Sequence, residues 1–180
     1  APPRAIVTTS PGPREGKSTT CANLGVALAQ AGRSTLLLDC DLRKPVVHEI
    51  FGLRNIRGVV DVLAGTRELR EVWHSPVPNL RVVPTGPIPP NPAELLSSRR
   101  FQQMLEEARG QFDYVLMDAP PVEAVSDPVI LATHSDGVLL VIDAQNTRKG
   151  AVRRAMRSLE AVGARVLGTV LNNAGETEGG

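Results

Sequence analysis

Short apolar runs alternate with longer segments of helical periodicity along the whole chain. Six runs have the length and apolar content of β-strands: residues 5–10, 35–39, 80–84, 112–118, 137–143 and 166–171. Helical patterns fill five of the intervening segments, at about residues 17–31, 92–98, 99–109, 127–133 and 147–162. The alternation predicts an α/β fold in which a doubly wound, mainly parallel sheet carries helices on both faces.

The second predicted strand is expected to lie inside the sheet. Its sequence, TLLLD over residues 35–39, is apolar on both faces, which is typical of a strand inside a parallel sheet. Ligands of open α/β sheets bind outside the carboxyl ends of the strands. The polar residues that follow each strand are therefore the first candidates for function.

A phosphate-binding loop is predicted between the first strand and the first helix, in the sequence SPGPREGKST. It follows the pattern GxxxxGK[ST], except that proline stands at the first position and Gly12 at the second. Such a loop wraps its backbone around phosphate oxygens at a helix N-terminus. Gly12, Glu15 and Gly16 are therefore predicted to bind nucleotide, and the fold is predicted to be a P-loop NTPase.

The end of the same loop carries the side chains that would touch ATP and Mg²⁺. Lys17 is predicted to reach the β- and γ-phosphates, and the Ser18 hydroxyl to ligate Mg²⁺. Thr19 could contact the α-phosphate. We expect Lys17 to lie on an exposed loop edge, so that its replacement would leave the fold intact. The alternative is an ordinary turn that contains GKS by chance; the strand before it and the helix after it argue against that.

Three carboxylates follow predicted strands. Asp39 and Asp41 end the run LLLDCD, and period-two alternation points both side chains the same way, with Cys40 on the opposite face. Asp118 ends the run YVLMD. Carboxylates at these positions can hold Mg²⁺, usually through water. Of the two acids on the second strand, one could orient the metal and the other could accept a hydroxyl proton, or either could only cap a turn.

Length and composition restrict the classes of protein that remain. A chain of 180 residues suits one domain over residues 1–180. The net charge of +1 supplies no overall field for nucleic acid, and no apolar run is long enough to span a bilayer. Two cysteines form no disulfide framework and favour a reduced, cytoplasmic setting. The chain starts without methionine and enters a strand almost at once, so we expect it to be a piece of a longer protein.

Three motifs together resemble the bacterial tyrosine kinases of capsular and exopolysaccharide synthesis, which have P-loops of the deviant Walker type. The motifs are TTSPGPREGKSTTCANL, LLLDCDLRKP and YVLMDAPP. The resemblance implies that Asp39 and Asp118 support the metal and that Asp41 ligates it or acts as base towards the acceptor tyrosine. It also implies that Asn172, after the last strand, reads adenine.

The resemblance brings expectations about partners, and the chain departs from the family at several points. The family often has glycine where Arg14 stands, and its tyrosine-rich tail is not seen in the closing AGETEGG. The only tyrosine, Tyr114, falls inside an apolar strand, where we expect a core position. The implied partners are an acceptor tyrosine-rich tail on another chain, a membrane-bound polysaccharide co-polymerase segment as activator, and further copies of the chain. The implied location is the cytoplasm, at the inner face of the membrane.

Two rival functions share the predicted fold. One is an assembly-switch ATPase similar to the septum-site and partition ATPases, which carry a second lysine early in the P-loop, where this chain has Gly12. The other is a non-catalytic scaffold that binds nucleotide. Gly12 favours the kinase over the first, and the complete set of Lys17, Asp39, Asp41 and Asp118 argues against the second.

Three charged segments allow more than one interpretation. Arg43 and Lys44 could close over phosphate, bind an acidic partner or be plainly solvated. Asp127, followed by proline, is expected to cap a helix. The basic run over residues 148–154 is expected to form a solvated face, with a subunit contact as the alternative.

Overall fold

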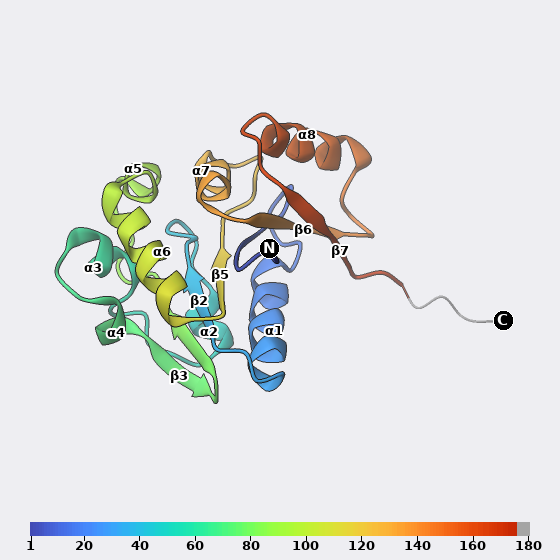
Figure 1. Cartoon of the computed structure of the whole chain (residues 1–180). Helices are drawn as coiled ribbons and strands as arrows, with labels where there is room; N and C mark the ends of the chain where they lie inside the picture. Colours follow the sequence, from blue (N-terminus) through green and yellow to red (C-terminus); the bar gives the residue numbers. More distant parts are fainter. Residues whose placement is uncertain (176–180) are drawn as a thin grey trace.

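A seven-stranded sheet forms the centre of the molecule (Figure 1), and the computed structural model describes residues 1–175. The strands are β1 (Ala5–Thr9), β2 (Thr35–Asp39), β3 (His74–Val77), β4 (Leu80–Val83), β5 (Tyr114–Asp118), β6 (Gly137–Asp143) and β7 (Val166–Asn172). Their spatial order is β3-β4-β2-β5-β1-β6-β7. Every neighbouring pair is parallel except β3 and β4, which are antiparallel.

Helices cover both faces of the sheet. They are α1 (Lys17–Gln30), α2 (Val47–Ile50), α3 (Val59–Ala64), α4 (Leu69–Val72), α5 (Pro92–Leu96), α6 (Arg99–Gln111), α7 (Asp127–His134) and α8 (Lys149–Glu160). Residues of α1 and α2 pack in one apolar core, and residues of α3 to α8 pack in the other. The doubly wound, mainly parallel fold predicted from the sequence is confirmed.

Alternation along β2 assigns its residues to the two cores. Leu36, Leu38 and Cys40 belong to the core under α3 to α8, whereas Leu37 belongs to the core under α1. The next residue on the α1 face is Asp39, so Cys40 points away from the carboxylates as the strand period requires. The α1 side is therefore the side on which the phosphate loop and the carboxylates can meet.

Edge strand β3 and the short helices α2, α3 and α4 are the elements that the sequence pattern did not predict. Each helix has four to six residues, which is too short to display a helical period. Strand β3 contains Pro76, which cannot donate to a sheet ladder and is tolerated on an edge strand. The six predicted strands are present, with ends that differ by no more than two residues.

Strand register brings the acidic strand ends together. Asp39 of β2 pairs with Asp118 of β5, and Thr8 of β1 pairs with the same aspartate from the other side. The loop that leaves β1 leads into α1, so the start of α1 lies over the same edge of the sheet. Three segments that are far apart in the sequence thus converge at the carboxyl ends of the central strands.

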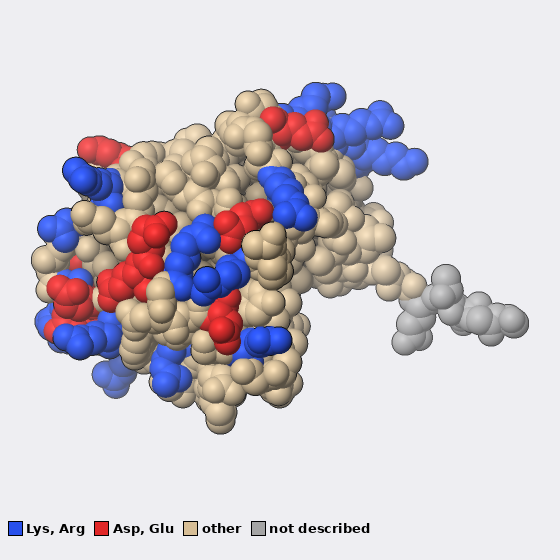
Figure 2. Space-filling view, in the orientation of Figure 1, with Lys and Arg blue, Asp and Glu red and all other residues tan. Residues whose placement is uncertain are grey.

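Helix α8 turns its basic residues to the solvent. Ala155 and Leu159 are buried against the sheet, while Arg153, Arg154 and Arg157 are exposed. Figure 2 shows Lys and Arg side chains projecting over this end of the molecule. No described helix has the length and the apolar content needed to cross a membrane.

The opposite, amino-terminal edge of the sheet is held by an ion pair between Arg109 and Asp136. The guanidinium donates to both carboxylate oxygens, at 2.9 and 3.1 Å. Burial acts to raise the pKa of Asp136, but the Arg109 hydrogen bonds and two backbone N–H groups outweigh it and lower the pKa to about 2. A lowered pKa means that this carboxylate stabilises the fold when it is ionised.

We predict that the effect of Asp136→Asn on stability depends on pH. The contribution of Asp136 is complete above its ordinary pKa of 3.8 and is lost as the pH falls towards 2. The loss of unfolding free energy in the variant should therefore be largest near neutral pH and should shrink below about pH 4. Urea unfolding at several pH values measures it, and a loss that grows on acidification would contradict the assignment.

Candidate functional site

The loop between β1 and α1 has the backbone shape that phosphate binding needs. Gly16 adopts a left-handed φ of 85° immediately before Lys17, the first residue of α1. The amide of Asn172 lies against this glycine and donates to the carbonyl of Glu15 at 3.1 Å. A side chain at position 16 would collide with Asn172, so only glycine fits. The end of β7 is thereby placed beside the loop.

Arg14 occupies a second left-handed position in the loop, with a φ of 59°. Glycine tolerates this conformation better than any other residue, which gives a physical reason for the glycine that the resembled family often has here. The side chain is exposed and lies at the border of two cavities. Arg14 therefore contributes no buried contact to the loop.

Lys17 is buried, which corrects the expectation of an exposed loop edge. It is 9% exposed, and its Nζ lies 3.3 Å from Asp41 Oδ2 and 3.3 Å from Asp118 Oδ1. The expectation was wrong because the loop folds back over the strand ends, and the ammonium finds the carboxylates there. Burial acts to lower the pKa of Lys17, but Asp118 and Asp41 outweigh it and raise the pKa, so the lysine stays charged.

Ser18 completes this arrangement with a hydroxyl group. Its Oγ donates to Asp118 Oδ2 at 2.6 Å, and Asp118 is fully buried. A hydroxyl and carboxylates are the hard oxygen ligands that Mg²⁺ prefers. In the described part of the chain no group of three or more His, Cys, Asp or Glu side chains could hold a metal ion by itself.

Asp39 faces the same region but is engaged by the backbone. Its Oδ1 accepts the N–H of Asp41 at 3.1 Å, and its Oδ2 accepts the N–H of Val47 at 3.3 Å. Burial raises the pKa of Asp39, and the neighbouring Asp118 raises it further. Asp39 therefore shapes the segment that carries Asp41, and its support of a metal ion stays a prediction.

Asp41 is held from two directions. Its Oδ1 accepts the backbone N–H groups of Arg43 and Lys44 at 3.3 and 3.0 Å, while Oδ2 faces the ammonium of Lys17. The carboxylate is 4% exposed and borders a cavity of about 550 Å³. Asp41 is thus fixed in direction and still reaches the space where substrates would bind.

This cavity is lined by several of the predicted residues, by Lys44, whose role the sequence left open, and by residues that the sequence did not indicate. Lys17, Ser18, Thr19 and Asp41 line it, together with Lys44, Val46 and Pro121. A second cavity, of about 450 Å³, borders the other side of the loop and is lined by residues of the connection between β6 and α8. Tyr114, expected in the core, is half-buried at the start of β5.

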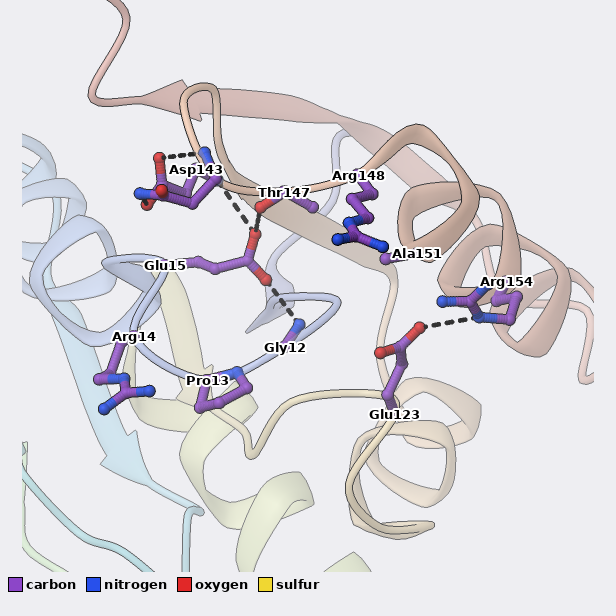
Figure 3. Close-up of a pocket in the computed structure, with 11 residues that line it drawn as sticks. Gly12, Pro13, Arg14, Glu15, Glu123, Asp143, Thr147, Arg148, Ala151 and Arg154 are labelled. Carbon is purple, nitrogen blue, oxygen red and sulfur yellow. Dashed lines mark hydrogen bonds and ion pairs between the residues drawn. The ribbon is translucent and has the colours of Figure 1, made fainter.

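The Glu15 side chain binds the protein itself (Figure 3). Its carboxylate is 5% exposed and accepts the N–H of Gly12 at 2.5 Å, the N–H of Asp143 at 3.0 Å and the hydroxyl of Thr147. The carboxylate therefore ties the start of the phosphate loop to the end of β6. What Glu15 can offer a nucleotide is its backbone, and the N–H of Gly12 is directed at Glu15.

We predict that Glu15→Gln weakens nucleotide binding about tenfold, because a glutamine cannot accept from all three donors and leaves one buried donor unpaired. The measurement is the Kd of a fluorescent ATP analogue. Glu123→Gln is the matched control, since Glu123 lines the same second cavity but is exposed, and within residues 1–175 its side chain pairs with Arg154 alone. Equal affinities of Glu15→Gln and wild type would remove Glu15 from the positioning of the loop.

Arg43 and Asp127 are partners in an ion pair that the sequence did not predict. The Arg43 guanidinium bonds to Asp127 through two hydrogen bonds, of 2.9 and 3.0 Å. The prediction that Asp127 caps a helix is wrong, because Ser126 occupies the cap position and Asp127 is the first residue of α7. No signal in the sequence joins these residues, which are 84 positions apart.

Fold and site together define a P-loop nucleotide-binding protein. An AAA domain family model matches residues 12–166. The tyrosine-protein kinase YwqD of Bacillus subtilis is 43% identical over 170 residues, which cover 94% of this chain and 72% of that protein. The tyrosine-protein kinase wzc of Salmonella typhimurium is 37% identical, over 93% of this chain and 24% of that longer protein. The chain belongs to the family of bacterial tyrosine kinases with a P-loop catalytic domain.

Solved structures agree with the family and with the fold. The chimerical protein CapA2B2 matches with a TM-score of 0.93 and 39% identity, over 96% of this chain and 77% of that one. The septum site-determining protein MinD of Pyrococcus horikoshii, complexed with Mg-ADP, matches with a TM-score of 0.81 and 25% identity, over 97% of this chain and 72% of that one. The tyrosine-protein kinase YwqD and the chimerical protein CapA2B2 are thus more similar in sequence to this chain than the septum site-determining protein is.

Proposed function

We propose that this domain transfers the γ-phosphoryl group of ATP to the hydroxyl of a tyrosine on another chain. The observation that carries the proposal is the buried contact of Lys17 with Asp41 and Asp118 at the carboxyl edge of the sheet, in a chain whose relatives are tyrosine kinases. A fixed cation next to fixed carboxylates is what phosphoryl transfer requires, because its catalysis rests on positioning and on charge stabilisation.

The proposed reaction is a direct displacement at the γ-phosphorus. The tyrosine oxygen forms a bond to phosphorus while the bond to the β,γ-bridging oxygen breaks, and ADP leaves. Asp41 takes the proton of the tyrosine hydroxyl, and Lys17 stabilises the negative charge on the β- and γ-phosphate oxygens. Ser18, Asp39, Asp41 and Asp118 are the candidates that would hold Mg²⁺, directly or through water, and the ion would add positive charge against the phosphates.

The apolar part of the cavity supports an aromatic acceptor. Pro13, Val46 and Pro121 line it next to Asp41, and such a wall suits the ring of a tyrosine whose hydroxyl faces a carboxylate. Tyr114 is held in β5, so the acceptor comes from elsewhere. The family resemblance supports a tyrosine-rich tail as acceptor and a role in capsule or exopolysaccharide synthesis.

The membrane-bound partner, oligomerisation and location are part of the same proposal. The wzc relative is about four times longer than the matched segment, so kinases of this family occur within larger chains. We propose that an activating segment of a polysaccharide co-polymerase binds this domain at the inner face of the membrane, where several copies assemble.

The assembly-switch ATPase is the second candidate, and the shared fold with the septum-site protein supports it. Against it stands Gly12, at the position where those ATPases place a second lysine. The N–H of this glycine bonds to Glu15 within the same chain.

One assay separates the two functions. The domain is incubated with Mg-ATP and a tyrosine-rich peptide, and phosphotyrosine by mass spectrometry and ADP release are followed in the same tube. Phosphotyrosine that requires Lys17 supports the kinase. ADP without phosphotyrosine, even after addition of a candidate activator segment, contradicts the kinase and supports the switch.

A further inference from the structure

The ion pair between Arg43 and Asp127 joins the two segments that carry the catalytic carboxylates. Arg43 lies two residues after Asp41, at the end of the β2 segment. Asp127 begins α7, which follows the connection that leaves β5 after Asp118. Strands β2 and β5 are neighbours in the sheet. A bond between their outgoing segments therefore spans the place where Lys17 meets Asp41 and Asp118.

The geometry of this pair is that of a strong and directional contact. The Asp127 side chain is fully buried, while the Arg43 side chain is 38% exposed. The guanidinium therefore offsets the cost of burying the negative charge of Asp127. Arg43 Nε donates to Asp127 Oδ2 and Arg43 Nη2 donates to Asp127 Oδ1, a bidentate arrangement that fixes the orientation of the arginine as well as its position. In the described part of the chain, no other side chain bonds to Asp127.

The backbone of Arg43 carries this constraint to Asp41. The N–H of Arg43 and the N–H of Lys44 both donate to Asp41 Oδ1. Oδ2 is thereby turned towards Lys17, at 3.3 Å. If the arginine side chain is released, the backbone that holds Oδ1 loses its anchor on α7.

We propose that Arg43 and Asp127 form a clamp that positions Asp41 for phosphoryl transfer. The two residues are positioning residues, since neither of them contacts Lys17 or lines the cavity next to it. The inference deepens the proposed reaction by adding residues that act on it through Asp41. The clamp rests on the proposed phosphoryl transfer only in the experiments that measure turnover.

The main test compares two variants that each break a bidentate Arg–Asp pair. Arg43→Gln breaks the clamp, and Arg109→Gln breaks the pair with Asp136 at the opposite edge of the sheet. Arg43→Gln is expected to lower kcat for ADP release about ten- to a hundredfold, the effect of a small misplacement, and to change KM for ATP less than threefold. Arg109→Gln is expected to keep kcat when both are assayed well below their melting temperatures. Wild-type kcat in Arg43→Gln, or an equal loss in Arg109→Gln, would overturn the clamp.

A second variant excludes simple destabilisation. Arg43→Gln leaves Asp127 buried without a cation, whereas the double variant Arg43→Gln/Asp127→Asn removes both charges. We expect the double variant to regain part of the lost melting temperature while its kcat stays low. A kcat that returns together with the melting temperature would mean that the pair acts on stability alone.

A measurement that needs no turnover keeps the clamp testable if the tyrosine-kinase proposal fails. Hydrogen exchange of the peptide over residues 40–47 reports on the amides of Arg43 and Lys44 that bond to Asp41. Exchange should become faster in Arg43→Gln and stay unchanged in Arg109→Gln. Unchanged protection in Arg43→Gln contradicts the clamp, whichever reaction the domain catalyses. Absence of phosphotyrosine in the wild type contradicts only the acceptor.

Discussion

Replacing Lys17 with methionine is expected to abolish phosphoryl transfer, with a fall in rate of at least about 1,000-fold. The substitution removes the cation that would stabilise charge on the transferred group, and the loss of a single fixed donor already costs on the order of 100- to 1,000-fold. Because Lys17 compensates Asp41 and Asp118 in a buried position, the variant should also unfold more easily. Breaking a buried ion pair costs about 3–5 kcal/mol.

Two measurements check this prediction: phosphotyrosine formation with excess Mg-ATP, and urea unfolding without nucleotide. Lys149→Met is the matched control, since Lys149 is exposed at the start of α8 and should be neutral in both assays. Transfer at the wild-type rate would remove Lys17 from the phosphate site. Loss of transfer with unchanged stability would contradict the expectation that the ion pairs of Lys17 with Asp41 and Asp118 stabilise the fold.

Replacing Asp41 with asparagine is expected to slow transfer by about 100-fold or more while changing the Kd of Mg-ATP only a few-fold. A positioned general base contributes on the order of 10²–10⁴ to a rate. The asparagine oxygen can still accept from the N–H groups of Arg43 and Lys44, so the segment keeps its shape. What is lost is the oxygen that faces Lys17, and with it the acceptor for the tyrosine proton.

Single-turnover kinetics and equilibrium binding separate the two roles proposed for Asp41. A rate loss with little change in affinity supports the base. Parallel losses of rate and of Mg²⁺-dependent affinity would make Asp41 a metal ligand. Asp113→Asn replaces an aspartate at the amino end of β5, where it accepts the N–H of Ser34, and should leave both quantities unchanged.

Sequence patterns predicted the elements that depend on local chemistry. The strand over residues 35–39 was predicted because its apolar run needs burial on both faces. The loop before Lys17 was predicted because glycine and lysine at this fixed spacing are typical of a phosphate-binding loop. Strand alternation also predicted that Asp39 and Asp41 point the same way and Cys40 the other, and the structure confirms this, with Cys40 in the core under α3 to α8 and Asp41 facing Lys17.

Contacts between segments that are distant in the sequence could not be predicted from those patterns. The burial of Lys17 depends on Asp118, which lies 101 positions away. The role of Glu15 depends on Asp143, 128 positions away. Such contacts follow from sheet order and register, and neither can be deduced from a single apolar run. The short helices of residues 47–72 were missed for the opposite reason, because each is smaller than the period that would reveal it.

The distances along the chain between the site residues also set an order of events during folding. Lys17 is 24 positions from Asp41 and 101 from Asp118. Contacts between such remote positions require the closure of long loops, which costs conformational entropy. A chain that is still emerging from the ribosome exposes Lys17 first and gains its last partner only when β5 has been made. The buried pairing of Lys17 with Asp118 therefore cannot be complete before residue 118 has been synthesised.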